Sequence, residues 1–256
     1  MSSILSFVDH NKLRITNYLL LPFSVVFFIL SQLRVWFYKV GILKVSKAEV
    51  PVIVVGNISI GGSGKTPIVT ALCRYFESHN KNVGVVSRGY GGKYTQDALE
   101  VTPLTDPKEC GDEPALIAQQ TNAKVVVAKR RNKAIKYLTS NNQVDIIISD
   151  DGLQHYAMGR DIEIAVIDGI LRFGNGLLLP SGPLREPLKR LKSVDIIVNN
   201  GSIVEGEYLV SSFLNVLLIC LPMKPKSLII SRELNVMLYL GSEIQKVLML
   251  SLKVRG

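Results

Sequence analysis

The chain has 256 residues, which is enough for one α/β domain with a substantial core and small additions at its ends. Apolar residues make up 47% of it, more than a purely soluble domain needs, so we expect some apolar surface to meet lipid. A formal charge of +9 suits an anionic partner, but no basic stretch interleaved with aromatic residues and no Cys/His finger accompanies it, so we expect no nucleic acid.

The first feature along the chain is a charge-free apolar run from Tyr18 to Leu30, which an aromatic stretch extends after a short polar break. A helix that crosses a bilayer needs about 20 mainly apolar residues, so a tilted span, a re-entrant segment and an interfacial helix all stay open. Arg34 and Lys39 beside aromatic side chains are typical of an anchor at headgroup level. A cleaved signal peptide and a buried core helix are the alternatives. We predict a membrane-associated helical segment over residues 1–48.

From residue 50 onward, apolar β-branched runs alternate with helical patterns. The runs are continuous, as in strands that are buried on both faces. We predict a domain over residues 49–208 with an α/β fold, built on a doubly wound, mostly parallel sheet of P-loop NTPase type. The predicted strands cover residues 51–57, 83–87, 124–129, 144–150, 162–168 and 194–200, and the predicted helices cover residues 67–79, 113–121 and 131–140.

The sharpest motif, GNISIGGSGKTP, lies between the first strand and the first helix. Glycines let the backbone approach phosphate closely, and the N–H groups at a helix start hold the anion. Lys65 is predicted to reach the β- and γ-phosphates and Thr66 a Mg²⁺ ion. The usual pattern has glycine at position 59, where this chain has Ser59. The predicted phosphate-binding residues are Ser59, Ile60, Gly61, Gly62, Ser63, Gly64, Lys65 and Thr66.

Two further loops carry candidate residues. Arg88 follows the second strand within SRGYGG, where it could meet phosphate, and a plain surface turn is the alternative. Asp112 lies in GDEP, just before a helical pattern. This carboxylate could cap the helix, or it could orient or deprotonate a hydroxyl nucleophile, and the spacing leaves both alternatives open.

Asp150 and Asp151 end the strand VDIIISD and precede Gly152. Ligands of open parallel sheets bind off the carboxyl ends of the strands, so we predict that both carboxylates face the P-loop and organise Mg²⁺. A strand-ending Asp-Gly turn is the alternative. His155 could face the same site. Between the last two predicted strands, the loop RFGNGLLLPSGPLREP is predicted to expose leucines that could meet acyl chains, unless it is an ordinary connection.

The five motifs GNISIGGSGKTP, SRGYGG, GDEP, DDGLQHY and RFGNGLLLPSGPLREP follow an apolar helix in this order. Over about residues 17–208 the chain resembles the tetraacyldisaccharide 4'-kinases, the lipid A 4'-kinases of Gram-negative bacteria. The family's loop reads G-N-x-x-x-G-G-x-G-K-T-P, so Ser59 is normal in it. The resemblance implies phosphorylation of the 4'-hydroxyl of a tetraacylated glucosamine disaccharide 1-phosphate, with ATP and Mg²⁺, at the cytoplasmic face of the inner membrane.

By this resemblance Lys65 and Thr66 bind phosphate and metal, Asp150 and Asp151 organise Mg²⁺, and Asp112 is the base. The predicted catalytic residues are therefore Asp112, Lys65 and Asp151, and the predicted metal ligands are Thr66, Asp150 and Asp151. The expected partners are the lipid A disaccharide precursor and the inner-membrane surface. A monomer is expected. The three cysteines lie far apart and predict reduced thiols, as in the cytoplasm.

The end of the chain departs from the family, whose members finish with a smaller C-terminal lobe. Residues 237–246, back-translated with permissible codons and read two nucleotides on, can spell AVSGIGNPK, a segment typical of that lobe. We therefore expect residues 209–256 to be a remnant of the lobe, with non-native readthrough of a frameshift after about residue 235. A catalytically defective nucleotide-binding protein stays an alternative. A regulatory P-loop GTPase is another, although its N-K-x-D and D-x-x-G motifs are missing.

Overall fold

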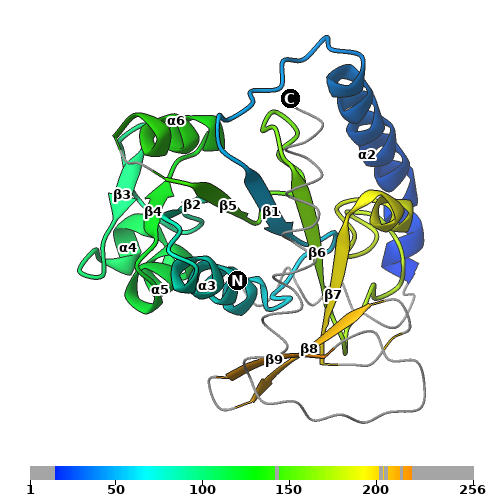
Figure 1. The fold of residues 1–256 in the computed structure, drawn as a ribbon. Helices are drawn as coiled ribbons and strands as arrows, with labels where there is room; N and C mark the ends of the chain where they lie inside the picture. Colours follow the sequence, from blue (N-terminus) through cyan, green and yellow to red (C-terminus); the bar gives the residue numbers. More distant parts are fainter. Residues whose placement is uncertain (1–14, 142–143, 202–203, 205–206, 214–215, 221–256) are drawn as a thin grey trace.

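The computed structural model describes residues 15–141, 144–201, 204, 207–213 and 216–220. In this part of the chain nine strands form one sheet in the order β3-β4-β2-β5-β1-β6-β7-β8-β9 (Figure 1). Neighbours from β4 to β8 pair in parallel, and the edge strands β3 and β9 pair antiparallel. The strands are β1 Val52–Gly56, β2 Val83–Ser87, β3 Leu99–Val101, β4 Lys124–Val127, β5 Ile146–Asp150, β6 Ile162–Asp168, β7 Ile196–Asn200, β8 Tyr208–Phe213 and β9 Val216–Cys220.

The six predicted strands are all present, which confirms the doubly wound, mostly parallel sheet. All five residues of β1, β2 and β5 are buried, as their continuous apolar runs indicated. The strands β3, β8 and β9 were not predicted. β3 has three residues, and β8 and β9 lie after residue 202, where the apolar rhythm of the sequence fades. β8 and β9 extend the sheet past residue 208.

Helices cover both faces of the sheet. On one face, Ile68 and Leu72 of α3 and Ile117 of α5 share a core cluster with Ile53 and Ile148 of the central strands. On the other face, α6 packs together with the segments that follow β5 and β6. The helices are α2 Ile15–Lys39, α3 Lys65–Ser78, α4 Pro107–Cys110, α5 Asp112–Gln120, α6 Arg131–Asn141 and the 3₁₀ helix η1 Leu188–Ser193. The three predicted helices correspond to α3, α5 and α6.

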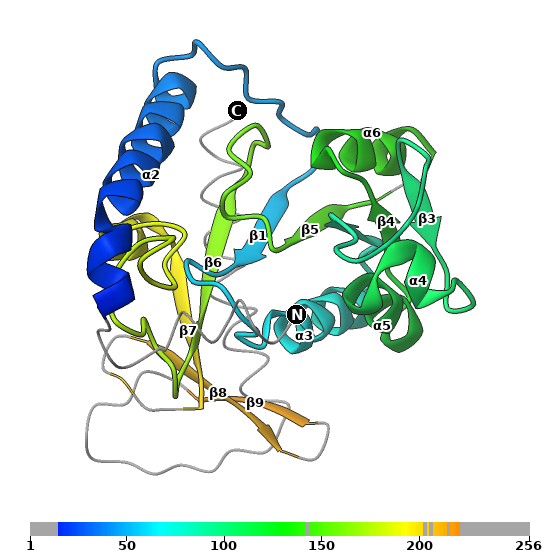
Figure 2. The ribbon, with the colours of Figure 1, turned by 180° about the vertical axis from the view of Figure 1, so that it is seen from behind.

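The N-terminal helix α2 stands at one side of the molecule, beside the loop between β6 and β7 (Figures 1 and 2). It is continuous for 25 residues, so the polar break expected within it is not a break in the helix. By length and composition it is a candidate membrane span, and only 6% of its most apolar 18-residue window is buried. That exposure makes the reading as a buried core helix wrong.

The buried side of α2 is polar. Asn17 and Ser24, seven residues apart, are its only buried residues. The Asn17 amide donates to the carbonyl of Ser181 (2.7 Å), and the Ser24 hydroxyl lies 2.8 Å from the Ser181 hydroxyl and 2.9 Å from the carbonyl of Leu178. The Ser181 N–H donates back to Ser24 Oγ at 3.0 Å. The helix therefore presents apolar side chains outward while polar side chains attach it to the loop.

The same loop corrects a prediction. Leu184 is buried, and Leu178 is partly buried against the core. The apolar side chains that are exposed near it are instead Ile170, Leu171 and Leu188, which flank the predicted stretch. The reason is that the backbone of this loop pairs with the loop between β1 and α3, which turns its leucines inward.

Candidate active site

The loop between β1 and α3 has the geometry of a phosphate-binding loop. Gly64 precedes α3 in the left-handed conformation, with φ +79°, and a Cβ added there would lie 2.3 Å from the side-chain amide of Asn200. Only glycine avoids both problems. By contrast, a Cβ added at Gly61 or Gly62 meets nothing within 4 Å. The loop is therefore packed tightly behind and open in front, where its backbone can approach a ligand.

The first half of this loop is fixed by backbone pairing. The N–H of Ile60 donates to the carbonyl of Pro183 (2.8 Å), and the N–H of Arg185 donates to the carbonyl of Ile58 (2.7 Å). Ser59 and Leu184 form an antiparallel bridge between these bonds. The predicted role of Ser59 and Ile60 in phosphate binding stays a prediction. The N–H of Ile60 would have to give up its present bond to contribute.

Lys65 and the two aspartates meet at the carboxyl end of β5. The Lys65 side chain is only 7% exposed, and its Nζ lies 3.7 Å from Asp151 Oδ1. Arg185 Nη1 lies 3.1 Å from Asp151 Oδ2. Burial alone would raise the pKa of Asp151, but the two cations outweigh it and hold the pKa below its usual value. Asp151 is therefore ionised at neutral pH.

Asp150 is completely buried. Its Oδ2 accepts from the Ser87 hydroxyl (3.2 Å), whereas its Oδ1 has no hydrogen-bond partner in the described part of the chain. Burial, together with the negative charges of Glu113 and Asp151, raises the pKa of Asp150 to about 6. An unpartnered buried carboxylate oxygen needs a cation or a water, so this atom fits a predicted metal ligand.

A buried arginine fixes the turn between these aspartates. Arg131, at the start of α6, donates from Nη2 to the carbonyls of Asp150 (2.9 Å) and Asp151 (2.7 Å). Asp151 has φ +49°, an uncommon conformation for a residue other than glycine. The two bonds hold the carbonyls of this strained turn in place, so the Asp151 carboxylate is directed at Lys65.

Asp112 is the first residue of α5 and is exposed. Gly111 occupies the cap position, so the alternative in which Asp112 caps the helix is wrong. A Cβ on Gly111 would lie 2.6 Å from the carbonyl of Tyr90, which shows how closely the loop after β2 packs on this junction. The structure thus places Asp112 at the same edge of the sheet as Asp150, but not among the residues that line the pocket described next.

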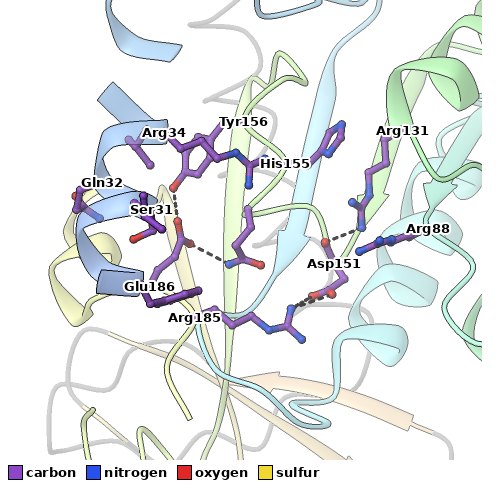
Figure 3. Close-up of a pocket in the computed structure, with 14 residues that line it drawn as sticks. Ser31, Gln32, Arg34, Arg88, Arg131, Asp151, His155, Tyr156, Arg185 and Glu186 are labelled. Atoms are coloured by element: carbon purple, nitrogen blue, oxygen red, sulfur yellow. Dashed lines mark hydrogen bonds and ion pairs between the residues drawn. The ribbon is translucent and has the colours of Figure 1, made fainter. Parts of the chain in front are cut away.

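A cavity of about 510 Å³ separates α2 from the ends of the strands (Figure 3). We call it the arginine pocket, because four arginines line it together with two acids. Phe27, Leu30 and Val35 of α2 form an apolar part of its wall. The lining residues are Phe27, Leu30, Ser31, Gln32, Arg34, Val35, Arg88, Arg131, Asp151, Gln154, His155, Tyr156, Arg185 and Glu186.

His155 lies in the wall of this pocket, as the sequence suggested (Figure 3). Burial, and then the positive charges of Arg131, Arg160 and Arg34, lower the pKa of His155 to about 4. The imidazole is therefore neutral at physiological pH. Its Nε2 is buried and has no hydrogen-bond partner among the described residues.

Glu186 links α2 to the phosphate-binding loop. One carboxylate oxygen accepts from the Tyr156 hydroxyl (Figure 3), and the other accepts from Gln154 Nε2 at 2.9 Å. Gln154 Nε2 also donates to the carbonyl of Asn57 (2.9 Å), at the start of the loop. The Tyr156 ring stacks on Tyr38 near the end of α2, with ring centroids 6.1 Å apart. The end of α2 and the start of the loop are thus joined by a continuous chain of contacts.

The comparisons with known proteins assign the chain to a family. A family model described as tetraacyldisaccharide-1-P 4'-kinase matches residues 16–228. The chain belongs to this kinase family. The tetraacyldisaccharide 4'-kinase of Ruthia magnifica subsp. Calyptogena magnifica is 57% identical over 194 residues, which are 76% of this chain and 62% of that protein. The tetraacyldisaccharide 4'-kinase of Mannheimia succiniciproducens is 50% identical over 184 residues, 72% of this chain and 57% of that protein.

The crystal structure of LpxK from Aquifex aeolicus in complex with ATP has the same fold, with a TM-score of 0.68 and 33% sequence identity. The match covers 77% of this chain and 64% of that chain. It confirms the expected P-loop fold class. This member of the tetraacyldisaccharide-1-phosphate 4'-kinase family spans 62% and 57% of the length of the two curated relatives named above.

Sequence reasoning missed several residues of this kinase-family site. Asn200, which donates from Nδ2 to the carbonyl of Ser63 (3.4 Å), stands in a strand that carried no motif. Arg131 and Gln154 act on backbone carbonyls, and no local pattern reveals such a contact. Glu186 lies within a quoted motif, but its burial is visible only in the structure. Among the described residues, no group of three or more His, Cys, Asp or Glu side chains could hold a metal by itself.

Proposed function

We propose that this chain supplies the nucleotide site and the acceptor site of an ATP-dependent kinase that phosphorylates the 4'-hydroxyl of a tetraacylated glucosamine disaccharide 1-phosphate in lipid A biosynthesis. One observation carries the proposal. The arginine pocket is bounded both by Asp151, which pairs with Lys65, and by apolar side chains of α2. A phosphate donor and an acceptor that stays in a membrane would therefore meet in one cavity. The relatives named above are tetraacyldisaccharide 4'-kinases.

Mg-ATP is the proposed phosphate donor. Its phosphates would lie along residues 61–66, where the glycines leave the backbone open, and Lys65 would balance charge on the transferred group. Thr66 and the unpartnered Oδ1 of Asp150 offer the oxygen ligands that Mg²⁺ prefers. Bound there, the ion would neutralise charge on the β- and γ-phosphate oxygens. The ATP-bound Aquifex structure is consistent with this donor.

The acceptor is proposed to occupy the arginine pocket. Its 1-phosphate is an anion that guanidinium groups bind well, because each presents several N–H donors in a planar fork. Arg34 of α2, Arg88 after β2 and Arg131 of α6 line the pocket from three different elements, which supports this role. Phe27 and Leu30 of α2 offer apolar surface to the acyl chains. The neutral His155 adds no charge to the pocket.

Asp112 is proposed as the base that takes the proton of the 4'-hydroxyl. Asp151 is poorly suited to that task, because the lowered pKa that Lys65 and Arg185 give it makes it a weak base. Its proposed role in catalysis is to hold Lys65 in position. Asp112 is exposed at the same edge of the sheet, where an incoming sugar could reach it.

The chain is proposed to act as a monomer on the cytoplasmic face of the inner membrane. Contacts at both ends of α2, from Asn17 and Ser24 near its start to Tyr38 near its end, hold the helix against the kinase body. This favours a helix that lies in the membrane interface over one that crosses the bilayer. We propose residues 1–48 as the membrane segment, 49–208 as the kinase domain and 209–256 as a lobe remnant. The expected frameshift after about residue 235 lies outside the described residues.

Transfer of labelled phosphate from ATP to the disaccharide lipid tests the proposal. Lys65→Ala and Asp112→Ala should each lower transfer at least a hundredfold, because each removes a group that acts on the reacting phosphate or hydroxyl. The exposed Lys81→Ala and Asp97→Ala are matched controls and should retain full transfer. If the parent and the four variants bind nucleotide but none of them transfers phosphate to the lipid, the alternative of a catalytically defective nucleotide-binding protein is favoured. Nucleotide hydrolysis that ignores the lipid would favour a regulatory NTPase.

A further inference from the structure

A second large cavity lies outside the site described above. It is an open groove of about 670 Å³ between α6 and the chain that leads into β1, and we call it the α6 groove. Among the described residues, His155 alone lines both this groove and the arginine pocket, so the two cavities adjoin at this residue. The residues that line the α6 groove are Ser46, Lys47, Ala48, Glu49, Arg130, Asn132, Lys133, Ile135, Lys136, Thr139, His155 and Ala157.

The α6 groove is strongly cationic. Four basic side chains line it, and Glu49 is the only acid among its described lining residues. Lys133 is neutralised by Asp97, which lies 2.5 Å from its Nζ. Lys47, Arg130 and Lys136 are exposed and form no ion pair within the described part of the chain. Three unpaired cations against the single acid Glu49 give the groove a net positive charge, which favours an anionic ligand.

The chain at the groove mouth is also pinned by backbone bonds. The N–H of Ser46 donates to the carbonyl of Ala157 (2.8 Å), and the N–H of Gly159 donates to the carbonyl of Ser46 (2.7 Å). A Cβ on Gly159 would lie 3.1 Å from the Cα of Lys47, so the two segments are in close contact. The position of Lys47 is thus set by structure on both sides of it.

An exposed apolar strip leads from α2 to this groove. Between Lys39 and Lys47 the chain passes over the top of the molecule as drawn in Figure 1, from the end of α2 toward α6. Within it, Ile42 is 62% exposed and Val40 is 50% exposed, and Leu43 and Val45 are also exposed. Apolar side chains interleaved with lysines are typical of chain that lies at a membrane surface. The strip continues the apolar surface of α2.

We propose that the α6 groove binds the phosphate headgroup of an anionic phospholipid, whose acyl chains lie along the apolar strip of residues 40–45. This site is separate from the acceptor site. It rests on the membrane association of α2, but not on phosphoryl transfer. Its effect would be to fix the rotation of the protein on the bilayer, because α2 alone offers one line of contact and the groove adds a second point away from that line.

Partition onto vesicles tests the proposal. The chain's only tryptophan, Trp36, is half exposed near the end of α2 and reports binding through its fluorescence. On vesicles of phosphatidylcholine with phosphatidylglycerol, Arg130→Gln/Lys136→Gln should bind about 25-fold more weakly than the parent, or about fivefold per cation. The matched control Lys81→Gln/Lys108→Gln removes the same charge from exposed positions outside the groove and should bind within about twofold of the parent. Equal losses in both double variants would overturn the proposal.

Two more arms separate the ligand source and the enzyme question. A soluble short-chain phosphatidylglycerol should compete with the vesicles for the parent protein, and inorganic phosphate at the same concentration should not. Equal competition by inorganic phosphate would reassign the groove to a free anion and refute the lipid. The labelled-phosphate assay with the acceptor in neutral detergent micelles tests the kinase alone. If no phosphate is transferred in micelles while vesicle binding still depends on the groove cations, the proposed kinase activity is refuted and the proposed lipid site is not.

Discussion

The replacement Gly64→Ala tests whether the loop before α3 is packed as the structure shows. Alanine at φ +79° costs about 1–2 kcal/mol, because a Cβ crowds the backbone in the left-handed region. The new Cβ would also lie 2.3 Å from Asn200 Nδ2, so that side chain must move and lose its bond to the Ser63 carbonyl, worth about 1 kcal/mol. We expect a total loss of about 2–3 kcal/mol in the free energy of unfolding, which lowers Tm by roughly 4–12 °C.

Gly62→Ala is the matched control for Gly64→Ala, because a Cβ at Gly62 meets open space. It should unfold within about 0.5 kcal/mol of the parent. Adding Asn200→Ala to Gly64→Ala removes the collision, so the double variant should lose about 1 kcal/mol less than the two single losses combined. Urea unfolding of the parent, Gly64→Ala, Asn200→Ala and the double variant, all without nucleotide, completes this double-mutant cycle. If Gly64→Ala proves as stable as Gly62→Ala, the packing of Asn200 on this loop is refuted.

Three other substitutions probe the site and the attachment of α2. The pKa of Asp150 is raised from 3.8 to about 6 by folding, so the folded protein binds a proton between these pH values and its stability falls as pH rises through them. Without nucleotide, the free energy of unfolding of Asp150→Asn should therefore exceed that of the parent by roughly 3 kcal/mol at pH 7, and the difference should disappear near pH 3.5. Equal unfolding curves of variant and parent at both pH values would contradict this. Ser24→Ala leaves the buried Ser181 N–H without its acceptor, so it should lower the free energy of unfolding by about 1–3 kcal/mol and speed amide hydrogen exchange in α2. The control Ser31→Ala, on the same helix, removes only a bond to its own turn. Similar exchange rates in the two variants would argue against the attachment. Tyr156→Phe keeps the ring on Tyr38 but removes the hydroxyl that donates to the buried Glu186, so it should lose about 1–3 kcal/mol in urea unfolding, and an unchanged midpoint would count against the chain of contacts.

The parts of the fold that sequence could predict are those fixed by local pattern. A strand buried on both faces must be apolar throughout, so β1, β2 and β5 were visible as continuous runs. The phosphate-binding loop was visible because its glycines and Lys65 stand at fixed spacing between a strand and a helix. The placement of Asp151 beside Lys65 followed from the rule that strand ends in a parallel sheet share one edge.

The remaining features depend on partners that are distant in the chain. Asn17 lies just before the apolar run and Ser24 lies within it, and only their contact with Ser181, more than 150 residues away, shows why polar side chains belong there. The polar stretch near residue 31 was read as a break for the same reason, since Ser31 continues the seven-residue spacing of Asn17 and Ser24. Glu186 could not be assigned because its partners, Gln154 and Tyr156, lie 32 and 30 residues away in the loop after β5.

One loop joins α2 to the phosphate-binding loop. Ser181 holds α2, and two and four residues later Pro183 and Arg185 pair with the phosphate-binding loop. A rearrangement of α2 on its attachment would therefore pull on the backbone that pairs with Ile58 and Ile60. The proposed kinase, whose acceptor would stay in the bilayer, requires a constant distance between the membrane surface and the transferred phosphate. A short, paired connection achieves that, because it leaves few backbone dihedral angles free between the two sites.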